Sequence, residues 1–276
     1  MTRLPDFLIV GTARSGSTAL YRYLADHPSI HMAATKEVRF FNRHYDRGLD
    51  WYIQQFDGAT ADQKLGEATP GYMNFPETID RMADVIPNAK LIVILRDPVD
   101  RAYSHYWMDR TRGRGEPTFE QYLDEHALPL DIGRYVERLE DLSRRYPREQ
   151  VLVVFYENLR SEPLDVYQRT CRFIGVDDSI VSQSVGRTVN QYVEFRSLTV
   201  RDWSKRLPGS LRVVKKAIGR LNTRTDVAYP PMKSETRQWL AEYYAEPNAA
   251  LAEWLDRDLP PWTGFSDPER PSGRSA

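Results

Sequence analysis

The stretch that decides the fold is Gly11-Thr12-Ala13-Arg14-Ser15-Gly16-Ser17-Thr18, whose two glycines have the spacing of a phosphate-binding loop. The usual pattern is G-x-x-x-x-G-K-[ST], but Ser17 stands at the lysine position and the cation, Arg14, lies inside the loop. An apolar run, 7–10, precedes the loop as a candidate strand, and residues 19–24 follow it as the first turns of a helix. Backbone N–H groups at the start of such a helix bind anions. The stretch therefore predicts a phosphate site that does not follow the ATP scheme.

Short apolar runs alternate with helical stretches over most of the chain. This alternation is typical of a parallel sheet that is covered on both faces. The sequence thus predicts an α/β fold, a P-loop-like parallel sheet flanked by helices on both faces, with a helical C-terminal part. The expected strands are 7–10, 65–68, 91–95 and 151–155, and the expected helices are 17–26, 49–56, 76–86, 98–110 and 131–146.

The chain of 276 residues is expected to form one domain over 1–262. Its α/β core covers 6–175, and 176–262 complete it mainly with helices and no strong strand. The expected helices of this second part are 197–205, 211–221 and 234–257. Residues 263–276 are rich in Pro, Ser and Gly, which predicts a disordered tail.

Composition and single residue types exclude several classes of protein. The net charge of -1 argues against bulk binding to nucleic acid. Cys171 is the only cysteine, so no intrachain disulfide forms, and its helical surroundings indicate a buried structural thiol. The five histidines have no metal-ligand spacing, and no metal is expected. The first apolar run is too short for a signal peptide or a membrane span, so we expect a cytoplasmic protein.

The segment 205–224 carries several basic and no acidic residues, with apolar residues at helical spacing. It is either a packed helix with a solvated face or an amphipathic surface for peripheral contact with a lipid or a lipid-like acceptor. The basic loop 109–115 is either solvated or guides an anionic ligand.

A second informative segment, 91–106, is a buried strand that ends in Arg96 and leads into a helix opened by Pro98. The carboxyl ends of parallel strands line the ligand crevice, so Arg96 should lie at the same rim as the glycine loop. Ser104, two turns into the helix, would then share an anion with Arg96. A kinase has a metal-binding aspartate where this strand ends, and the arginine argues against a metal–nucleotide. Alternatively, Arg96 pairs with Asp97 or Asp100, and Ser104 is an ordinary helix residue.

Together the two segments resemble the sulfotransferases that use 3′-phosphoadenosine 5′-phosphosulfate (PAPS). Three further segments resemble the heparan sulfate branch of that family. Residues 36–41, KEVRFF, are similar to its E-P-H-F-F; 45–52, YDRGLDWY, to its Y-D-K-G-L-x-W-Y; and 67–72, EATPGY, to its E-K-T-P-S-Y. The resemblance extends from about residue 5 to 175, with a weaker echo at 195–248.

The resemblance implies roles for single residues. The loop would hold the 5′-phosphosulfate through Arg14, Ser15, Gly16, Ser17 and Thr18. Arg96 and Ser104 would hold the 3′-phosphate. Glu37 matches the family's glutamate base. Apart from the resemblance, His105 is the competing base, because it follows Ser104 and histidine side chains titrate near neutral pH. Arg14 matches the loop lysine that stabilises the bridging oxygen, and an arginine there acts by charge alone.

Two departures from the family pattern concern cations. Ala68 replaces the lysine of E-K-T-P, and Lys36 or Arg39 are the candidates to compensate. Arg224 is the candidate for the family's basic lid over the nucleotide.

The expected function is transfer of a sulfuryl group from PAPS to a hydroxyl or amine of a small-molecule, carbohydrate or lipid acceptor, which the sequence does not identify. A small-molecule kinase is one alternative, but it needs a loop lysine and a metal-binding carboxylate. A non-catalytic anion-binding protein is the other, but it would not need Glu37. We expect no nucleic-acid partner, and the oligomeric state stays open.

Overall fold

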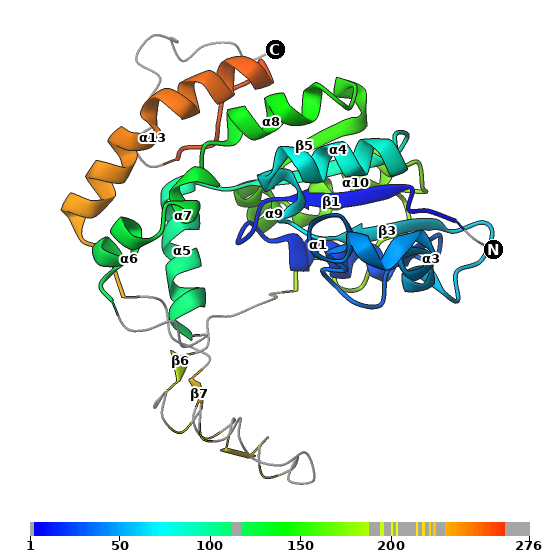
Figure 1. Ribbon diagram of the computed structural model, residues 1–276, viewed down its shortest axis with the longest axis horizontal. Helices are drawn as coiled ribbons and strands as arrows, with labels where there is room; N and C mark the ends of the chain where they lie inside the picture. Colours follow the sequence, from blue (N-terminus) through cyan, green and yellow to red (C-terminus); the bar gives the residue numbers. More distant parts are fainter. Residues whose placement is uncertain are drawn as a thin grey trace.

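A five-stranded parallel sheet lies at the centre of the computed structural model (Figure 1). Its strand order is β2-β3-β1-β4-β5, and every neighbouring pair is parallel. The strands are β1 (Phe7–Gly11), β2 (Ile30–Met32), β3 (Lys64–Ala68), β4 (Lys90–Leu95) and β5 (Val151–Phe155). The structure describes residues 3–111, 117–187, 194–195, 200, 203, 214, 217–218, 221, 223–224 and 230–262.

Helices connect the strands and form the layers on either side of the sheet. The longer ones are α1 (Ser17–Ala25), α4 (Pro76–Val85), α5 (Pro98–Thr111), α8 (Tyr135–Ser143), α10 (Pro163–Ile174) and α13 (Ser234–Leu255). The shorter ones are α2 (Phe40–Arg43), α3 (Gly48–Ile53), α6 (Phe119–Glu125), α7 (Leu128–Asp131) and α9 (Tyr156–Ser161), with 3-10 turns η1 (Tyr45–Arg47), η2 (Gln54–Phe56), η3 (Tyr72–Asn74) and η4 (Arg148–Gln150).

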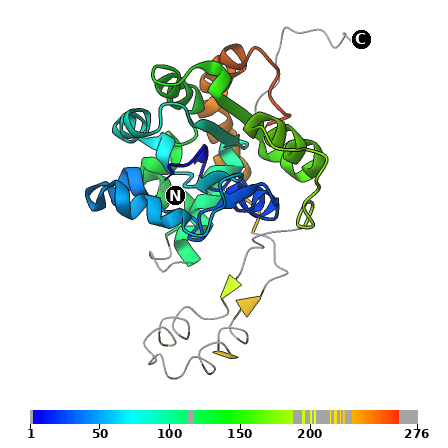
Figure 2. The ribbon, with the colours of Figure 1, turned by 90° about the vertical axis from the view of Figure 1, so that its right-hand side faces the viewer.

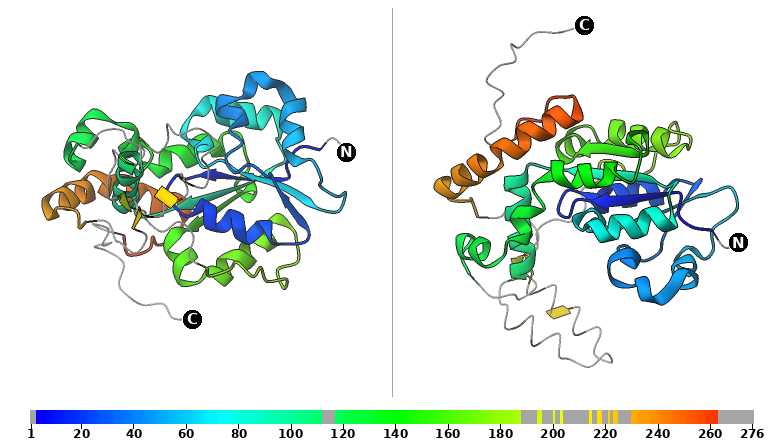
Figure 3. Two further views of the ribbon diagram at one scale, coloured as in Figure 1. Left: turned by 90° about the horizontal axis from the view of Figure 1, so that it is seen from below. Right: turned by 45° about the horizontal axis from the view of Figure 1, so that its top comes forward.

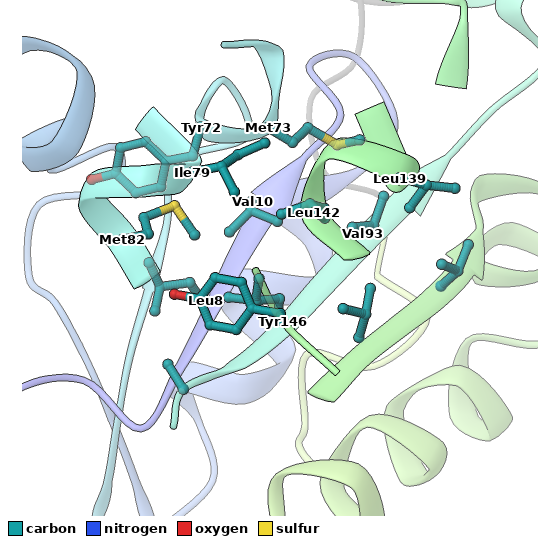
Figure 4. Packing of buried hydrophobic residues seen from close by; sticks show 14 of the residues in the cluster. Leu8, Val10, Tyr72, Met73, Ile79, Met82, Val93, Leu139, Leu142 and Tyr146 are labelled. Atoms are coloured by element: carbon teal, nitrogen blue, oxygen red, sulfur yellow. The ribbon is translucent and has the colours of Figure 1, made fainter. Parts of the chain in front are cut away.

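The central strand β1 is buried on both faces. Leu8 and Val10 pack with α4, α8 and α13 on one face, as Figure 4 shows for the first two helices. Phe7 and Ile9 pack with α1 and α10 on the other face. Figures 2 and 3 show these helices on opposite sides of the sheet. Because both faces are covered, β1 and β4 are continuous apolar runs without polar alternation, which is the pattern that made them recognisable in the sequence.

The predicted fold class is confirmed, and so are the four predicted strands. The prediction missed β2, an edge strand of three residues with His31 at its centre, because so short a segment has no apolar run. After residue 176 the sequence predicts no strong strand, and in the described part of that region the structure has only a very short pair. β6 (Glu194–Phe195) and β7 (Thr223–Arg224) form a two-residue antiparallel pair, which leaves no periodic signal in a sequence.

The predicted helices agree with the structure where it describes them. The helix expected at 131–146 is shorter and begins at Tyr135, after the separate helix α7. The long helix expected at 234–257 is α13. The segments 197–205 and 211–221 lie largely, and the tail 263–276 entirely, outside the described residues. No helix in the described part of the chain is long and apolar enough to cross a membrane.

Cys171 lies on α10 against the sheet and is completely buried, which confirms a structural thiol. Burial raises its pKa to about 11, so the reactive thiolate is scarce at neutral pH.

Gly66 gives a direct test of how β3 packs against β1. A Cβ on this residue would lie 2.2 Å from Cζ of the completely buried Phe7. Gly66→Ala should therefore lower the free energy of unfolding by about 1–3 kcal/mol, the usual cost of overpacking a core. Urea denaturation measures this change.

The matched control is Gly71→Ala. Its added Cβ would meet nothing closer than 3.7 Å, and its φ is -99°, which alanine adopts readily. This variant should unfold at nearly the wild-type urea concentration. Equal midpoints for both variants would contradict the packing of Phe7 over β3.

Candidate functional site

The glycine loop between β1 and α1 is built on two close backbone approaches. A Cβ on Gly11 would lie 1.8 Å from Sδ of Met73, which is itself buried. Gly16 has a φ of 90°, and a Cβ there would lie 2.9 Å from a methyl carbon of Leu159 and 3.0 Å from the ring of Tyr156. Both glycines are therefore required by the loop's path.

Side-chain and main-chain bonds tie the loop to β4. The N–H and the hydroxyl of Thr12 both donate to the carbonyl of Ile94, at 2.9 and 3.0 Å. Oγ of the buried Ser15 lies 2.6 Å from Oγ1 of Thr12. The helix α1 begins at Ser17, and the first N–H groups of a helix have no acceptor within it. The end of the loop therefore presents backbone donors of the kind that bind phosphate groups.

Three cofactor residues expected from the sequence lie together at this loop. Nε of Arg14 donates to Oγ of Ser104 on α5, at 3.0 Å. Nη1 of Arg96, just after β4, donates to the carbonyl of Arg14, at 3.1 Å. The guanidinium of Arg96 also lies over the ring of Tyr156, 4.6 Å from its centre. Two cations and a hydroxyl thus meet at the carboxyl ends of β1 and β4, as expected for a phosphate site.

The alternative arrangement, with Arg96 paired to Asp97 or Asp100, is not the one adopted. Asp97 caps the start of α5, where its Oδ1 accepts from the N–H of Val99 at 2.8 Å. Asp100 forms an ion pair with Arg237 of α13, at 2.9 Å. Neither carboxylate occupies the guanidinium of Arg96.

Two residues that the sequence did not point to hold Arg96 in place. The hydroxyl of Tyr135 on α8 donates to the carbonyl of Arg96, at 2.8 Å. On the other side of the same peptide, the N–H of Asp97 donates to Glu157 of α9, at 3.1 Å. The strand end is therefore anchored by two helices, through contacts that span 39 and 60 residues of the chain.

Glu37, the expected base, lies at the carboxyl end of β3, although it follows β2 in the chain. β3 is the neighbour of β1 in the sheet. Its N–H donates to the carbonyl of Ala68, at 3.0 Å. Its carboxylate accepts from Nε of Arg39 at 3.1 Å and pairs with Nζ of Lys36 at 3.4 Å. The two cations proposed to replace the lysine missing at Ala68 thus both contact Glu37.

Partial burial by itself would raise the pKa of Glu37. The hydrogen bond from Arg39 and the charge of Lys36 outweigh this effect, and the pKa lies below its usual value. Glu37 is therefore ionised at neutral pH, and its carboxylate can accept a proton.

Backbone strain gathers at the same place. Among the described non-glycine residues, four have a positive φ: Arg14 (73°), Glu37 (63°), Arg39 (57°) and Asp256 (51°). Asp256 ends α13, where a left-handed residue is common. The other three belong to the candidate site, and strain of about 1–3 kcal/mol per residue is typical of functional sites.

The remaining candidates are less well defined. His105 follows Ser104 on α5, and its Nδ1 lies 3.5 Å from Nη1 of the completely buried Arg101. Arg224 pairs through its backbone with Glu194 in the antiparallel pair of β6 and β7, and its side chain lies outside the described part of the structure. Most of the basic loop 109–115 also lies outside it. Within the described ranges, no group of three or more His, Cys, Asp or Glu side chains converges as a metal site would require.

Glu67 is a residue near the site that the sequence did not identify as functional. Glu67, inside the predicted strand 65–68, is completely buried and accepts hydrogen bonds from Tyr52, Tyr72 and Thr69. Burial raises its pKa to about 7 although all three hydrogen bonds favour the carboxylate. A charged residue within an apolar run was the signal that could have found it.

Comparisons with known proteins agree with this arrangement. A family model described as "Sulfotransferase domain" matches residues 4–212. Bifunctional heparan sulfate N-deacetylase/N-sulfotransferase 4 of Mus musculus is 32% identical over 287 residues, covering 94% of this chain and 31% of that protein. Heparan sulfate glucosamine 3-O-sulfotransferase 3A1 of Homo sapiens is 30% identical over 271 residues, covering 95% of this chain and 63% of that protein.

Among solved structures, a sulfotransferase from Alicyclobacillus acidocaldarius superposes with a TM-score of 0.72 at 26% identity, covering 93% of this chain and 98% of that one. The chain spans 31% of the length of the first bifunctional relatives that it matches, so it corresponds to one part of those proteins.

The contacts of Glu37 predict the effect of removing a neighbouring charge. Arg39→Gln should raise the pKa of Glu37, because it removes a charged donor that favours the carboxylate. Lys36 remains, so the pKa should rise only part of the way. For a general base the rate falls as the pH drops through this pKa, so the acid limb of the pH–rate profile should move to higher pH. NMR titration of the Glu37 carboxyl carbon measures the pKa directly.

Arg43→Gln is the matched control, since Arg43 is an exposed arginine at the end of the short helix α2, which Arg39 directly precedes. It should leave the pKa of Glu37 unchanged. An unchanged pKa in Arg39→Gln would show that Arg39 does not hold the carboxylate in solution.

Proposed function

Because the chain belongs to the sulfotransferase domain family, we propose that it moves the sulfuryl group of PAPS to a hydroxyl or amine of an acceptor. The family and the sulfotransferase fold predicted from the motifs are confirmed. The observation that carries the proposal for the donor is the contact of Arg14 with Ser104 and of Arg96 with the loop, which unites the expected phosphate ligands.

We assign the two ends of the donor to two parts of this site. The loop from Arg14 to Thr18 offers backbone N–H groups and one cation, which suit the 5′-phosphosulfate. Arg96 and Ser104 offer a fork of donors and a hydroxyl at the adjacent strand end, which suit the 3′-phosphate. Tyr156 beneath Arg96 keeps the guanidinium in place for such a contact. The residues present therefore fit the nucleotide.

Glu37 and Arg14 would each act on one end of the reaction, Glu37 on the acceptor and Arg14 on the leaving oxygen. Glu37 accepts the proton of the attacking hydroxyl or amine as the new bond to sulfur forms. The bond from sulfur to the bridging phosphate oxygen breaks, and its electron pair stays on that oxygen. Arg14 stabilises this charge, which is larger in the transition state than in the bound donor. The products are the sulfated acceptor, the bisphosphate nucleotide and a proton on Glu37.

The two alternative functions are less well supported. A kinase would need a loop lysine and a metal-binding aspartate after β4, and this chain has Ser17 and Arg96 there. A non-catalytic anion-binding protein would have no use for the carboxylate of Glu37, which is held on strained backbone. Neither alternative explains why Glu37, Lys36 and Arg39 are held together beside the loop.

For the acceptor and the cellular setting we make only broad proposals. Relatives named for heparan sulfate make a carbohydrate acceptor a reasonable candidate, beside small molecules and lipids. A cytoplasmic location and peripheral contact of 205–224 with a membrane stay proposals, which fractionation of cells would test. A transfer assay with ³⁵S-labelled PAPS against a panel of cell extracts, with mass spectrometry of the labelled product, would identify the acceptor.

Calorimetry should separate the proposed donor from the kinase substrate. The chain should bind 3′-phosphoadenosine 5′-phosphate without Mg²⁺ and more tightly than it binds ATP with Mg²⁺. Arg96→Ala should weaken the bisphosphate roughly ten- to a hundredfold, since a charged hydrogen bond contributes about 1.5–3 kcal/mol. The same variant should affect adenosine 5′-phosphosulfate less, because that nucleotide has no 3′-phosphate.

Two results would count against this assignment. Tighter binding of ATP with Mg²⁺ would favour the kinase. Equal losses for both nucleotides in Arg96→Ala would place Arg96 away from the 3′-phosphate.

Glu37→Gln should lower turnover by roughly 10²–10⁴, the usual contribution of a general base, with little change in donor affinity. Glutamine keeps the shape of the side chain but accepts no proton at neutral pH. Initial rates of ³⁵S transfer at saturating PAPS, into the extract fraction that the wild-type chain labels, measure the effect.

His105→Gln is the parallel variant, since His105 is the competing base. An inactive His105→Gln together with a nearly normal Glu37→Gln would move the base to His105 and leave the sulfotransferase function standing.

A further inference from the structure

The buried carboxylate of Glu67 is a titratable group that the proposed chemistry does not use. It lies at the end of β3 and is completely buried. Its Oε1 accepts hydrogen bonds from the hydroxyls of Tyr52 and Tyr72, at 2.6 and 2.9 Å. Its Oε2 accepts from Oγ1 of Thr69, at 2.9 Å. All three hydrogen bonds that the carboxylate accepts come from hydroxyl groups.

The hydroxyl of Thr69 has a second partner. Its Oγ1 accepts from the N–H of Arg39, at 3.2 Å. A hydroxyl group has one proton and two lone pairs. Because the hydroxyl of Thr69 donates its proton in the hydrogen bond to Glu67, its lone pairs accept the hydrogen bond from the N–H of Arg39. The carboxylate therefore sets the direction of both hydrogen bonds.

The N–H of Arg39 belongs to residues 36–39, which carry Glu37 and are called the base segment here. The backbone of this segment is strained. Glu37 and Arg39 both have left-handed backbone, which non-glycine residues adopt only when their surroundings require it. Two bonds from β3 hold this segment: Arg39 to the hydroxyl of Thr69, and the N–H of Glu37 to the carbonyl of Ala68. The side chain of Arg39 then holds the carboxylate of Glu37.

Building on the proposed function, we propose that Glu67 and Thr69 are positioning residues, which act through Arg39 to hold the carboxylate of Glu37 where it accepts the acceptor's proton. They touch neither donor nor acceptor in this proposal. The path runs from Glu67 to the Thr69 hydroxyl, to the N–H of Arg39, and through the arginine side chain to Glu37.

The three hydrogen bonds to Glu67 favour a carboxylate over a neutral side chain at this place. Burying a carboxylate away from water is unfavourable, and burial raises the pKa of Glu67 to about 7. A glutamine would fit the same space without a charge. In either orientation, however, its NH₂ group would face a hydroxyl that now donates, either that of Thr69 or those of the two tyrosines. Only the carboxylate accepts all three bonds.

Thr69→Val and Thr69→Ser test the hydroxyl at nearly constant shape. Thr69→Val should speed hydrogen exchange of the Arg39 N–H at least roughly tenfold, because its acceptor is lost. Transfer of ³⁵S at saturating PAPS should fall roughly 10–100-fold, as expected for a misplaced catalytic group. Affinity for 3′-phosphoadenosine 5′-phosphate should change less than about twofold, because the loop is tied to β4 by Thr12. Thr69→Ser should retain most of the transfer rate and of the exchange protection.

Thr170→Val is the matched control for loss of a buried threonine hydroxyl. Thr170 is completely buried on α10, and its Oγ1 donates to the carbonyl of Val166 in its own helix, at 2.7 Å. It should change stability without affecting Arg39 exchange or the transfer rate. Glu67→Gln is the second variant, which tests the same path if Thr69→Val does not fold. It should also speed hydrogen exchange of the Arg39 N–H and slow transfer.

Wild-type exchange and transfer in Thr69→Val and Glu67→Gln would overturn the proposal. Slower transfer with unchanged Arg39 exchange and weaker nucleotide binding would also overturn it, since Thr69 would then act on the donor. If the wild-type chain transfers no label to any extract, the proposed function fails. Hydrogen exchange at Arg39 still decides in that case whether Glu67 and Thr69 hold the segment.

Discussion

Two main-chain hydrogen bonds at the carboxyl end of the sheet hold the whole site together. The N–H of Thr69 donates to the carbonyl of Ile9, at 3.0 Å, and the N–H of Thr12 donates to that of Ile94, at 2.9 Å. They join the ends of β3, β1 and β4. The glycine loop follows β1 and Arg96 follows β4, while residues 36–39 follow β2 in the chain and are hydrogen-bonded to Ala68 and Thr69 at the end of β3. Since each of these segments follows or is bonded to one of the three strand ends, the register of the sheet sets their relative positions.

The site combines concentrated positive charge with one carboxylate. Arg14 and Arg96 meet at the loop, and Lys36 and Arg39 flank Glu37. Such a surface favours an anionic ligand and keeps the carboxylate of Glu37 ionised. It also costs stability, because three of its residues have left-handed backbone. The stability for this comes from elsewhere, from a sheet buried on both faces by apolar side chains. The fold thus separates the stabilising core from the strained edge.

The sequence predicted well which residues gather at the glycine loop, because these residues follow apolar strands closely and their placement needs no knowledge of distant contacts. Gly16, Arg96 and Ser104 could be placed by counting along the chain from β1 and β4. The supporting residues could not be placed in this way. Tyr135 and Glu157 reach Arg96 from helices 39 residues or more away, and no local pattern links them to it. β2 was missed for the related reason that three residues have no period.

By itself the sequence determined the α/β class, the lysine-free glycine loop and the family, because glycine spacing, apolar runs and ordered motifs are local properties of the chain. Only the tertiary structure decided what each polar side chain does. It showed that Lys36 and Arg39 both hold Glu37, that Asp97 caps a helix instead of pairing with Arg96, and that Glu67 is linked to the base segment through Thr69. Hydrogen bonds are short and directional, so their partners are chosen by the folded backbone and not by proximity in the sequence.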